Sequence, residues 1–100
     1  EQKLDKEGKS MNYNEFMEKL ADKLDLPKDV LINLPVITLT GDLVLNVENF
    51  KGIVRYEENS VVLNSTIGDI EILGENLFIK YLVSDEVRIE GKIKKIIIKD

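Results

Sequence analysis

The sequence predicts a small, mainly β domain with one short helix near its N-terminus, and three observations support this prediction. The chain has 100 residues, 43% of them hydrophobic, which suits a single compact domain with one core. After Pro35, Val, Ile, Thr and Leu dominate and alternate with polar residues, as in strands with one buried face. Turn-forming residues interrupt this part at short intervals, so we expect up to eight short strands.

The first ten residues contain one large apolar side chain, Leu4, among charged and small residues. Such a composition cannot bury itself, so we expect a flexible segment over residues 1–13 and a single domain over residues 14–100. Met11 would suit a natural start. Residues 1–10 are then either an appended sequence or a native extension, and both readings stay open.

An amphipathic helix is predicted over residues 14–26. Phe16, Leu20 and Leu24 recur every fourth residue, and charged residues occupy the opposite face. Pro27 ends the helix, because the residue before a proline avoids the helical region. We expect the apolar stripe to pack against the sheet. The alternative is a helix that docks on a partner or lies on a membrane surface.

The strands after Pro35 are predicted to be mostly antiparallel, because the gaps between them leave no room for parallel crossovers. Two of the predicted turns are 74–76 and 90–92. Ile97 is expected to point away from its neighbours Ile96 and Ile98, either beneath a second sheet, which is slightly favoured, or at an open sheet edge. The alternation predicts a shared face for Leu43, Leu45 and Val47, for Ile70 and Ile72, for Leu77, Ile79, Tyr81 and Val83, for Val87 and Ile89, and for Ile96 and Ile98.

A short motif occurs twice, 27 positions apart, with Gly-Asp at its start and Glu-Asn at its end. Two architectures fit this repeat: an antiparallel meander folded into a small sandwich or roll, or a short β-solenoid. Only two copies are present and a solenoid usually needs three, so the meander is favoured. Gly41 and Gly68 are expected in tight turns with positive φ, which glycine adopts most easily.

The composition excludes several classes of function. There is no Cys and no His, which removes the commonest nucleophile after Ser, the commonest general base and the commonest transition-metal ligands. We therefore expect no enzyme activity and no cofactor. The formal charge of −5 disfavours nucleic-acid binding. No apolar run exceeds three residues, so we expect a soluble, unexported chain without a membrane span.

Acidic residues provide the first candidate sites. The repeat suggests two paired-carboxylate sites, Asp42 with Asp69 and Glu48 with Glu75, although an Asp beside a turn glycine normally bonds nearby backbone. The acidic stretch 57–60 offers oxygen ligands for calcium, but it lacks the spacing of an EF-hand loop, and a hairpin tip explains it equally.

Two further motifs have plain structural explanations. Asn64-Ser65-Thr66 fits the N-glycosylation pattern, which an unexported chain would not use. A basic cluster forms either a phosphate-binding patch or a solubilising flank of an apolar strand, and the second is favoured. We therefore assign no catalytic, cofactor-binding or metal-binding residue. The cluster consists of Lys92, Lys94, Lys95 and Lys99.

The stretch 24–41 resembles the start of the YabP/YqfC family of sporulation proteins, and most closely its YqfC branch. A short helix leads into Leu26-Pro27-Lys28-Asp29-Val30, followed by Leu34-Pro35-Val36-Ile37-Thr38 and a glycine turn. The resemblance covers roughly residues 16–99. It continues through Val47-Glu48-Asn49 and Gly52, through Ile67-Gly68, and to Val87-Arg88-Ile89-Glu90-Gly91.

The resemblance implies a small protein needed for endospore formation, made in the mother cell of a spore-forming Gram-positive bacterium. It implies no catalytic residues, and it implies a membrane protein partner resembling YqfD. We expect a structural or adaptor protein in the mother-cell cytoplasm, peripheral at the forespore membrane. Two alternatives remain: a β-scaffold that self-assembles at the forespore surface through sheet edges, including the one near Ile97, and a hydrolase that uses only Asp or Glu.

Overall fold

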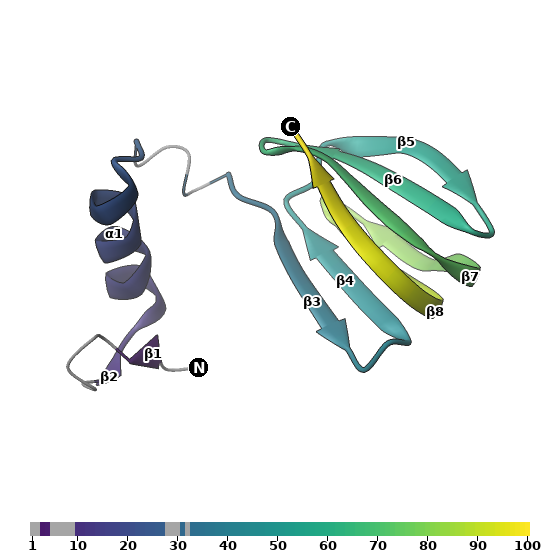
Figure 1. The fold of residues 1–100 in the computed structure, drawn as a ribbon, viewed down its shortest axis with the longest axis horizontal. Helices are drawn as coiled ribbons and strands as arrows, with labels where there is room; N and C mark the ends of the chain where they lie inside the picture. Colours follow the sequence, from purple (N-terminus) through teal and green to yellow (C-terminus); the bar gives the residue numbers. More distant parts are fainter. Residues whose placement is uncertain (1–2, 5–9, 28–30, 32) are drawn as a thin grey trace. The chain divides into compact units, whose positions relative to one another are not determined.

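The computed structural model describes residues 3–4, 10–27, 31 and 33–100. The chain divides into two compact units, residues 1–33 and 34–100, and each unit is described by itself (Figure 1). The first unit contains the helix, and the second contains the large sheet.

The N-terminal unit is built on the helix α1, Tyr13–Leu24, which follows two short antiparallel strands, β1 (Lys3–Leu4) and β2 (Ser10–Met11). Asn12 caps the helix, because its Oδ1 accepts a hydrogen bond of 2.7 Å from the backbone N–H of Glu15. Asp25 ends the helix in a left-handed conformation with φ 57°.

The predicted helix is confirmed, with both ends displaced by one or two residues toward the N-terminus. The helix ends at Leu24 with Asp25 as its C-cap, so its end does not require Pro27. Ala21 is buried and Leu24 is exposed. The packing of the helix against the sheet stays a prediction, and the predicted flexible segment 1–13 lies partly outside the described residues.

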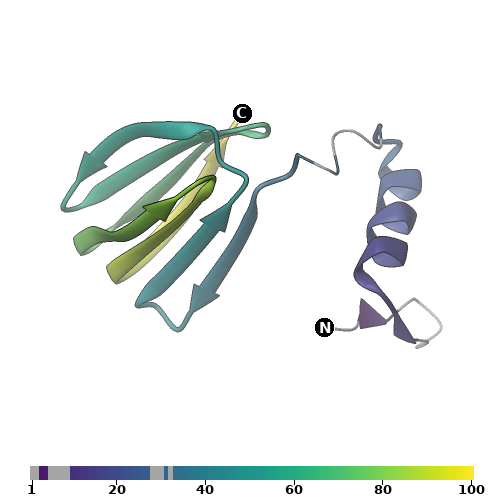
Figure 2. The same cartoon turned by 180° about the vertical axis from the view of Figure 1, so that it is seen from behind.

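Six antiparallel strands form one sheet in the order β3-β4-β8-β7-β6-β5 (Figures 1 and 2). The mainly β class and the antiparallel pairing are confirmed. The alternative of a short solenoid is wrong, because solenoid coils pair in parallel. Of the favoured small sandwich or roll, the sandwich and the number of up to eight strands are not confirmed, because the six strands form one open sheet. The strands are β3 (Val36–Thr40), β4 (Val44–Glu48), β5 (Gly52–Glu57), β6 (Ser60–Ser65), β7 (Gly68–Val83) and β8 (Glu86–Lys99).

Two predicted turns, 74–76 and 90–92, are in fact bends within the long strands β7 and β8. A Cβ at Gly74 would lie 2.0 Å from the carbonyl oxygen of Lys92, and a Cβ at Gly91 would lie 2.6 Å from that of Asn76. The register between the two strands also shifts here. These glycines therefore allow a close approach of two backbones at a bend, where the sequence suggested chain reversal.

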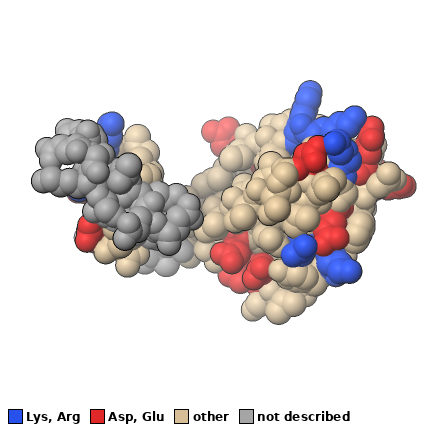
Figure 3. Space-filling view, turned by 90° about the horizontal axis from the view of Figure 1, so that it is seen from below, with Lys and Arg blue, Asp and Glu red and all other residues tan. Residues whose placement is uncertain are grey.

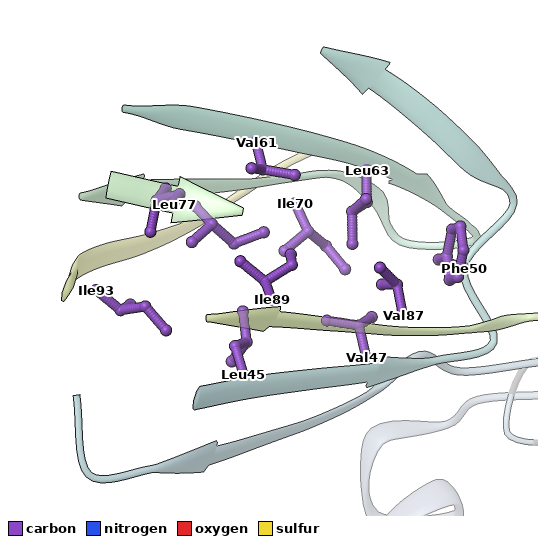
Figure 4. Close-up of a cluster of buried hydrophobic side chains, with 11 residues drawn as sticks. Leu45, Val47, Phe50, Val61, Leu63, Ile70, Leu77, Val87, Ile89 and Ile93 are labelled. Atoms are coloured by element: carbon purple, nitrogen blue, oxygen red, sulfur yellow. The ribbon is translucent and has the colours of Figure 1, made fainter. Parts of the chain in front are cut away.

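The core lies where the two halves of the bent sheet face each other. β6 and the first half of β7 contribute from one side, and β4 and the first half of β8 contribute from the other (Figure 4). The predicted burial of Leu45, Val47, Ile70, Ile72 and the pair 87/89 is confirmed. The buried cluster consists of Leu45, Val47, Phe50, Val61, Leu63, Ile70, Ile72, Leu77, Val87, Ile89 and Ile93.

The alternation misplaced several other side chains. Leu43 is exposed because it lies in the turn between β3 and β4. A register shift between Ile79 and Tyr81 sets Tyr81 opposite Arg88, so Tyr81 leaves the buried face. Ile98 is exposed because β4 pairs only with residues 86–90 of β8, which leaves the far end of β8 at an edge.

The repeated motif reflects the same backbone conformations at two places in the chain. Gly41 and Gly68 have φ of 57° and 111°, as predicted. The two asparagines that end the copies, Asn49 and Asn76, also have positive φ, 64° and 54°. Glycine and asparagine are the residues that tolerate this region best, so the motif recurs because the same backbone conformations recur. The first copy spans the β3–β4 turn and β4, and the second copy forms the first part of β7.

Candidate partner-binding surface

The predicted carboxylate pairs do not form. Asp42 is in an ion pair with Lys92, and the Asp69 carboxylate accepts a hydrogen bond of 3.1 Å from the Asn64 amide. Glu75 pairs with Lys94 at 2.9 Å. Each partner lysine lowers the pKa of its carboxyl group, chiefly through the hydrogen bond. Within the described residues, no cluster of three acidic side chains could hold a metal ion.

The basic cluster is largely neutralised by these acids. Lys92 and Lys94 are paired as described, and Lys99 lies 3.2 Å from a carboxylate oxygen of Glu71. Asp42 and Glu75, acidic residues of the repeated motif, therefore lie against lysines of β8. This arrangement supports a solvated strand flank more than a phosphate-binding patch.

The remaining candidate segments are also structural. In the β5–β6 turn, the backbone carbonyl groups of Glu58 and Asn59 accept hydrogen bonds from the N–H groups of Leu77 and Gly74, at 2.7 and 3.1 Å. The backbone of the acidic stretch 57–60 thereby holds the bend of β7 in place. In the β6–β7 turn, the Ser65 hydroxyl donates to a backbone carbonyl at 2.7 Å. Turn chemistry accounts for both segments.

A surface that the sequence did not reveal lies on the outer side of β4, β8 and the second half of β7. Phe78, Tyr81 and Val83 are 44%, 37% and 61% exposed on β7. Aromatic side chains are enriched in protein interfaces, because they bury a large area at a small cost in conformational entropy. We call this surface the aromatic-acidic face. It consists of Phe78, Tyr81, Val83, Glu86, Arg88, Glu90, Asn46 and Glu48.

The register of the strands places these side chains together. Phe78 lies opposite Glu90, Tyr81 opposite Arg88, and Val83 opposite Glu86. Residues directly opposite each other in an antiparallel pair share one face of the sheet. Since the intervening residues 87 and 89 of β8 are fully buried, this set occupies the outer face.

Hydrogen bonds fix the orientation of the central side chains. The Tyr81 hydroxyl donates to a Glu86 carboxylate oxygen at 2.9 Å, and the Arg88 Nε donates to Glu90 at 2.7 Å. The bond to Glu86 is the main cause of a raised pKa of Tyr81, because the phenolate would lose this bond. Side chains held in this way lose little freedom when a partner binds.

The face is predominantly acidic. Glu48 and Glu86 lie opposite each other in neighbouring strands, and Glu90 lies further along β8, with Arg88 as the cation between them. Figure 3 shows both acidic and basic groups set among broad uncharged areas on the visible side of the sheet unit. A surface of carboxylates and aromatic rings fits a partner segment with both basic and apolar residues.

One feature of the sequence could have indicated this face: two of its six aromatic residues, Phe78 and Tyr81, lie close together. The alternation instead assigned Tyr81 and Val83 to the buried side. The register shift after Ile79, which turns them outward, has no recognisable sequence signature.

In the part of the chain that the structure describes, no helix is long and apolar enough to cross a membrane.

Comparison of the sequence with known proteins identifies a matching family. The sequence profile of the YabP family matches residues 33–100, which include all six strands of the large sheet. The uncharacterized protein YqfC of Bacillus subtilis (strain 168) is 38% identical over 74 residues, or 74% of this chain and 80% of that protein. No solved structure matches the chain.

Proposed function

Because this chain belongs to the YabP family, we propose that it is a non-catalytic structural or adaptor protein in endospore formation. In this proposal the protein acts in the mother-cell cytoplasm, next to the forespore membrane. Its partner is a sporulation membrane protein resembling YqfD, as the sequence resemblance implies. The partner binds through side-chain contacts, and no chemical step is assigned.

The observation that carries this proposal is the aromatic-acidic face. Phe78, Tyr81 and Val83 lie exposed along one stretch of β7. Exposed apolar groups that gather on one surface commonly mark interaction sites, and aromatic residues often supply most of the binding energy. The hydrogen bond between Tyr81 and Glu86 holds the ring in place before a partner arrives.

The charge of this face supports a membrane protein as the partner. Glu48, Glu86 and Glu90 outnumber the one cation, Arg88. Membrane proteins carry an excess of Lys and Arg in their cytoplasmic segments close to the bilayer. A basic segment that also contains apolar residues would complement both the carboxylates and the aromatic rings.

Three of the four residues singled out as candidate catalysts support a binding role over hydrolysis, and the fourth, Glu48, lies on the aromatic-acidic face. Asp42 and Glu75 are paired with lysines, and Asp69 accepts a hydrogen bond from Asn64. A general acid and base would need two carboxyl groups that converge on one substrate position. These three carboxyl groups instead serve the turns and the bend of the sheet.

Co-purification from sporulating cells tests the proposal. The full chain is isolated with a tag, and the amount of the membrane protein resembling YqfD that accompanies it is measured. The double variant Phe78→Ala/Tyr81→Ala is expected to retain less than about a tenth of the partner, because interface aromatics often contribute about 2 kcal/mol each. Val54→Ala is the matched control, since Val54 is 60% exposed on β5, outside the face.

Two measurements accompany this experiment. Urea unfolding midpoints establish that both variants are folded, and counts of heat-resistant spores report the cellular role. If the double variant retains the partner and forms spores as the Val54→Ala control does, the adaptor proposal fails.

The alternative function, a self-assembling scaffold, is favoured by one feature, the uncharged outer edge of β3. Open-ended growth requires two different complementary surfaces on each chain. Sedimentation over a range of concentrations separates the two functions. A scaffold gives species that keep growing with concentration, whereas an adaptor gives a small species of fixed size.

A further inference from the structure

The outer edge of β3 stands out among the described strands. β3 lies at one end of the sheet and pairs only with β4. Its five residues, Val-Ile-Thr-Leu-Thr, carry no charge, and four of the five are exposed. An edge strand of this kind presents backbone N–H and C=O groups that another strand can bind.

The other edges of the sheet have features that discourage strand addition. β5 has a register shift between Ile53 and Arg55, and it also carries charged side chains. The free part of β8 carries several lysines. On the second half of β7, the Ile79 N–H donates to the Tyr56 hydroxyl at 2.9 Å. Bulges, charges and covered donors are the usual protections of edge strands, and β3 has none of them.

The register of the hairpin identifies the backbone groups at the edge of β3. The Gly91 N–H donates to the Leu43 carbonyl, so the backbone groups of Leu43 point toward β8. Backbone N–H and C=O groups alternate in direction along a strand, so those of residue 45 also point toward β8 and those of Asn46 point toward β3. Thr38 lies opposite Asn46, so the backbone N–H and C=O groups of Thr38 point toward β4. The N–H and C=O groups of Ile37 and Leu39 consequently point outward, four groups in all.

We propose that β3 pairs with β3 of a second copy of this chain, antiparallel, about a two-fold axis at Thr38. In this register Ile37 of each copy exchanges hydrogen bonds with Leu39 of the other, which uses all four outward groups. An axis at Ile37 would set Pro35, which has no N–H, opposite Leu39. An axis at Leu39 would set Gly41, a turn residue, opposite Ile37. Only the Thr38 register is fully paired.

The side chains of β3 are also self-complementary in this register. Ile37 and Leu39 lie opposite the buried residues Val47 and Leu45, so they line the core side of the sheet. Leu39 is 46% exposed there, and pairing sets it beside Ile37 of the second copy. On the other side Thr38 meets Thr38. No charge opposes a like charge, so the two-fold contact has no electrostatic penalty within the strand.

The two-fold arrangement closes after two copies, because each chain uses the same edge. The dimer is therefore distinct from an open scaffold. The pairing uses no residue of the aromatic-acidic face, although Thr38 lies beside Asn46 on the same side of the sheet.

A single cysteine tests the register directly, because the chain contains no other cysteine. Opposite residues of a non-hydrogen-bonded antiparallel pair have Cα atoms about 4.5 Å apart, a separation that a disulfide can span. Mild oxidation of the full-length Thr38→Cys variant is expected to give a covalent dimer. The matched control Thr40→Cys is expected to remain mostly uncrosslinked, because residue 40 would lie opposite Val36 of the second copy.

A charge exchange provides the second measurement. Sedimentation equilibrium is expected to show a dimer for the unmodified chain and a dissociation constant raised at least about tenfold for Thr38→Lys and for Thr38→Glu, through like-charge repulsion at the axis. Mixing the two variants is expected to restore a dimer. A monomeric unmodified chain, equal crosslinking at positions 38 and 40, or failure of the mixture to associate would each overturn the proposal.

Discussion

Substituting Gly74 by alanine tests whether the bend of β7 and β8 requires a bare backbone. Gly74 does not have a positive φ, so alanine introduces no backbone strain by itself. Its Cβ, however, would lie 2.0 Å from the Lys92 carbonyl oxygen and 3.1 Å from a methyl carbon of Leu77. Real Cβ atoms essentially never approach other atoms within 3.0 Å, so the two strands would have to separate by about 1 Å.

The expected cost follows from this displacement. Overpacking a well-packed region typically costs about 1–3 kcal/mol, and a lost backbone hydrogen bond adds about 1 kcal/mol. We expect Gly74→Ala to lower the free energy of unfolding by about 2–4 kcal/mol. Leu77 and Ile93, which flank the bend, are buried, so the separation also disturbs the core.

Urea unfolding of Gly74→Ala and two controls measures this effect. At Gly41 an added Cβ meets nothing within 4 Å, but φ is 57°, so Gly41→Ala is expected to cost only about 1–2 kcal/mol. Gly41→Asn should cost less still, because Asn49 and Asn76 already adopt this conformation. If Gly74→Ala is no more destabilising than Gly41→Ala, the explanation of the bend by close approach is wrong.

Three further outcomes are expected. Tyr81→Phe should lower the urea midpoint at neutral pH, because it removes the hydrogen bond to Glu86. Since folding raises the Tyr81 pKa, the difference in stability between the variant and the unmodified chain should be full below the ordinary tyrosine pKa of about 10 and vanish as pH rises through the pKa of the folded state. A stability difference that persists at high pH contradicts this. Ile97→Lys should cost less than about 1 kcal/mol in urea unfolding, because Ile97 is only half-buried and lies opposite Glu71, whereas a loss of several kcal/mol would mean that this side is covered. Leu20→Ala should lower stability by about 2–4 kcal/mol if the helix packs on the sheet as the sequence predicts, and unchanged thermal unfolding would refute that packing.

The buried faces of the short strands could be predicted from sequence because alternation is a local property. The pattern around Leu45 and Val47, and again around Ile70 and Ile72, identified the core correctly. The number of strands could not be predicted in this way. A glycine that permits close approach, such as Gly74, is indistinguishable in sequence from a glycine that makes a turn, such as Gly41.

The candidate surface was harder to predict, because it depends on register between distant residues. Asn46 and Tyr81 are 35 positions apart, yet both lie opposite Arg88 in neighbouring strands. The pairing of Asp42 with Lys92, 50 positions apart, likewise converts a suspected catalytic residue into half of an ion pair. Local patterns contain neither the register shift after Ile79 nor these contacts between strands.

The most direct test of the proposed adaptor role is crosslinking in sporulating cells from a photoreactive residue at position 81, in the centre of the aromatic-acidic face. A matched chain carries the same residue at position 54, on the exposed edge strand β5. The proposal predicts a strong covalent adduct with the membrane protein resembling YqfD from position 81 and little from position 54. An adduct from position 54 alone, or none from position 81, would contradict it.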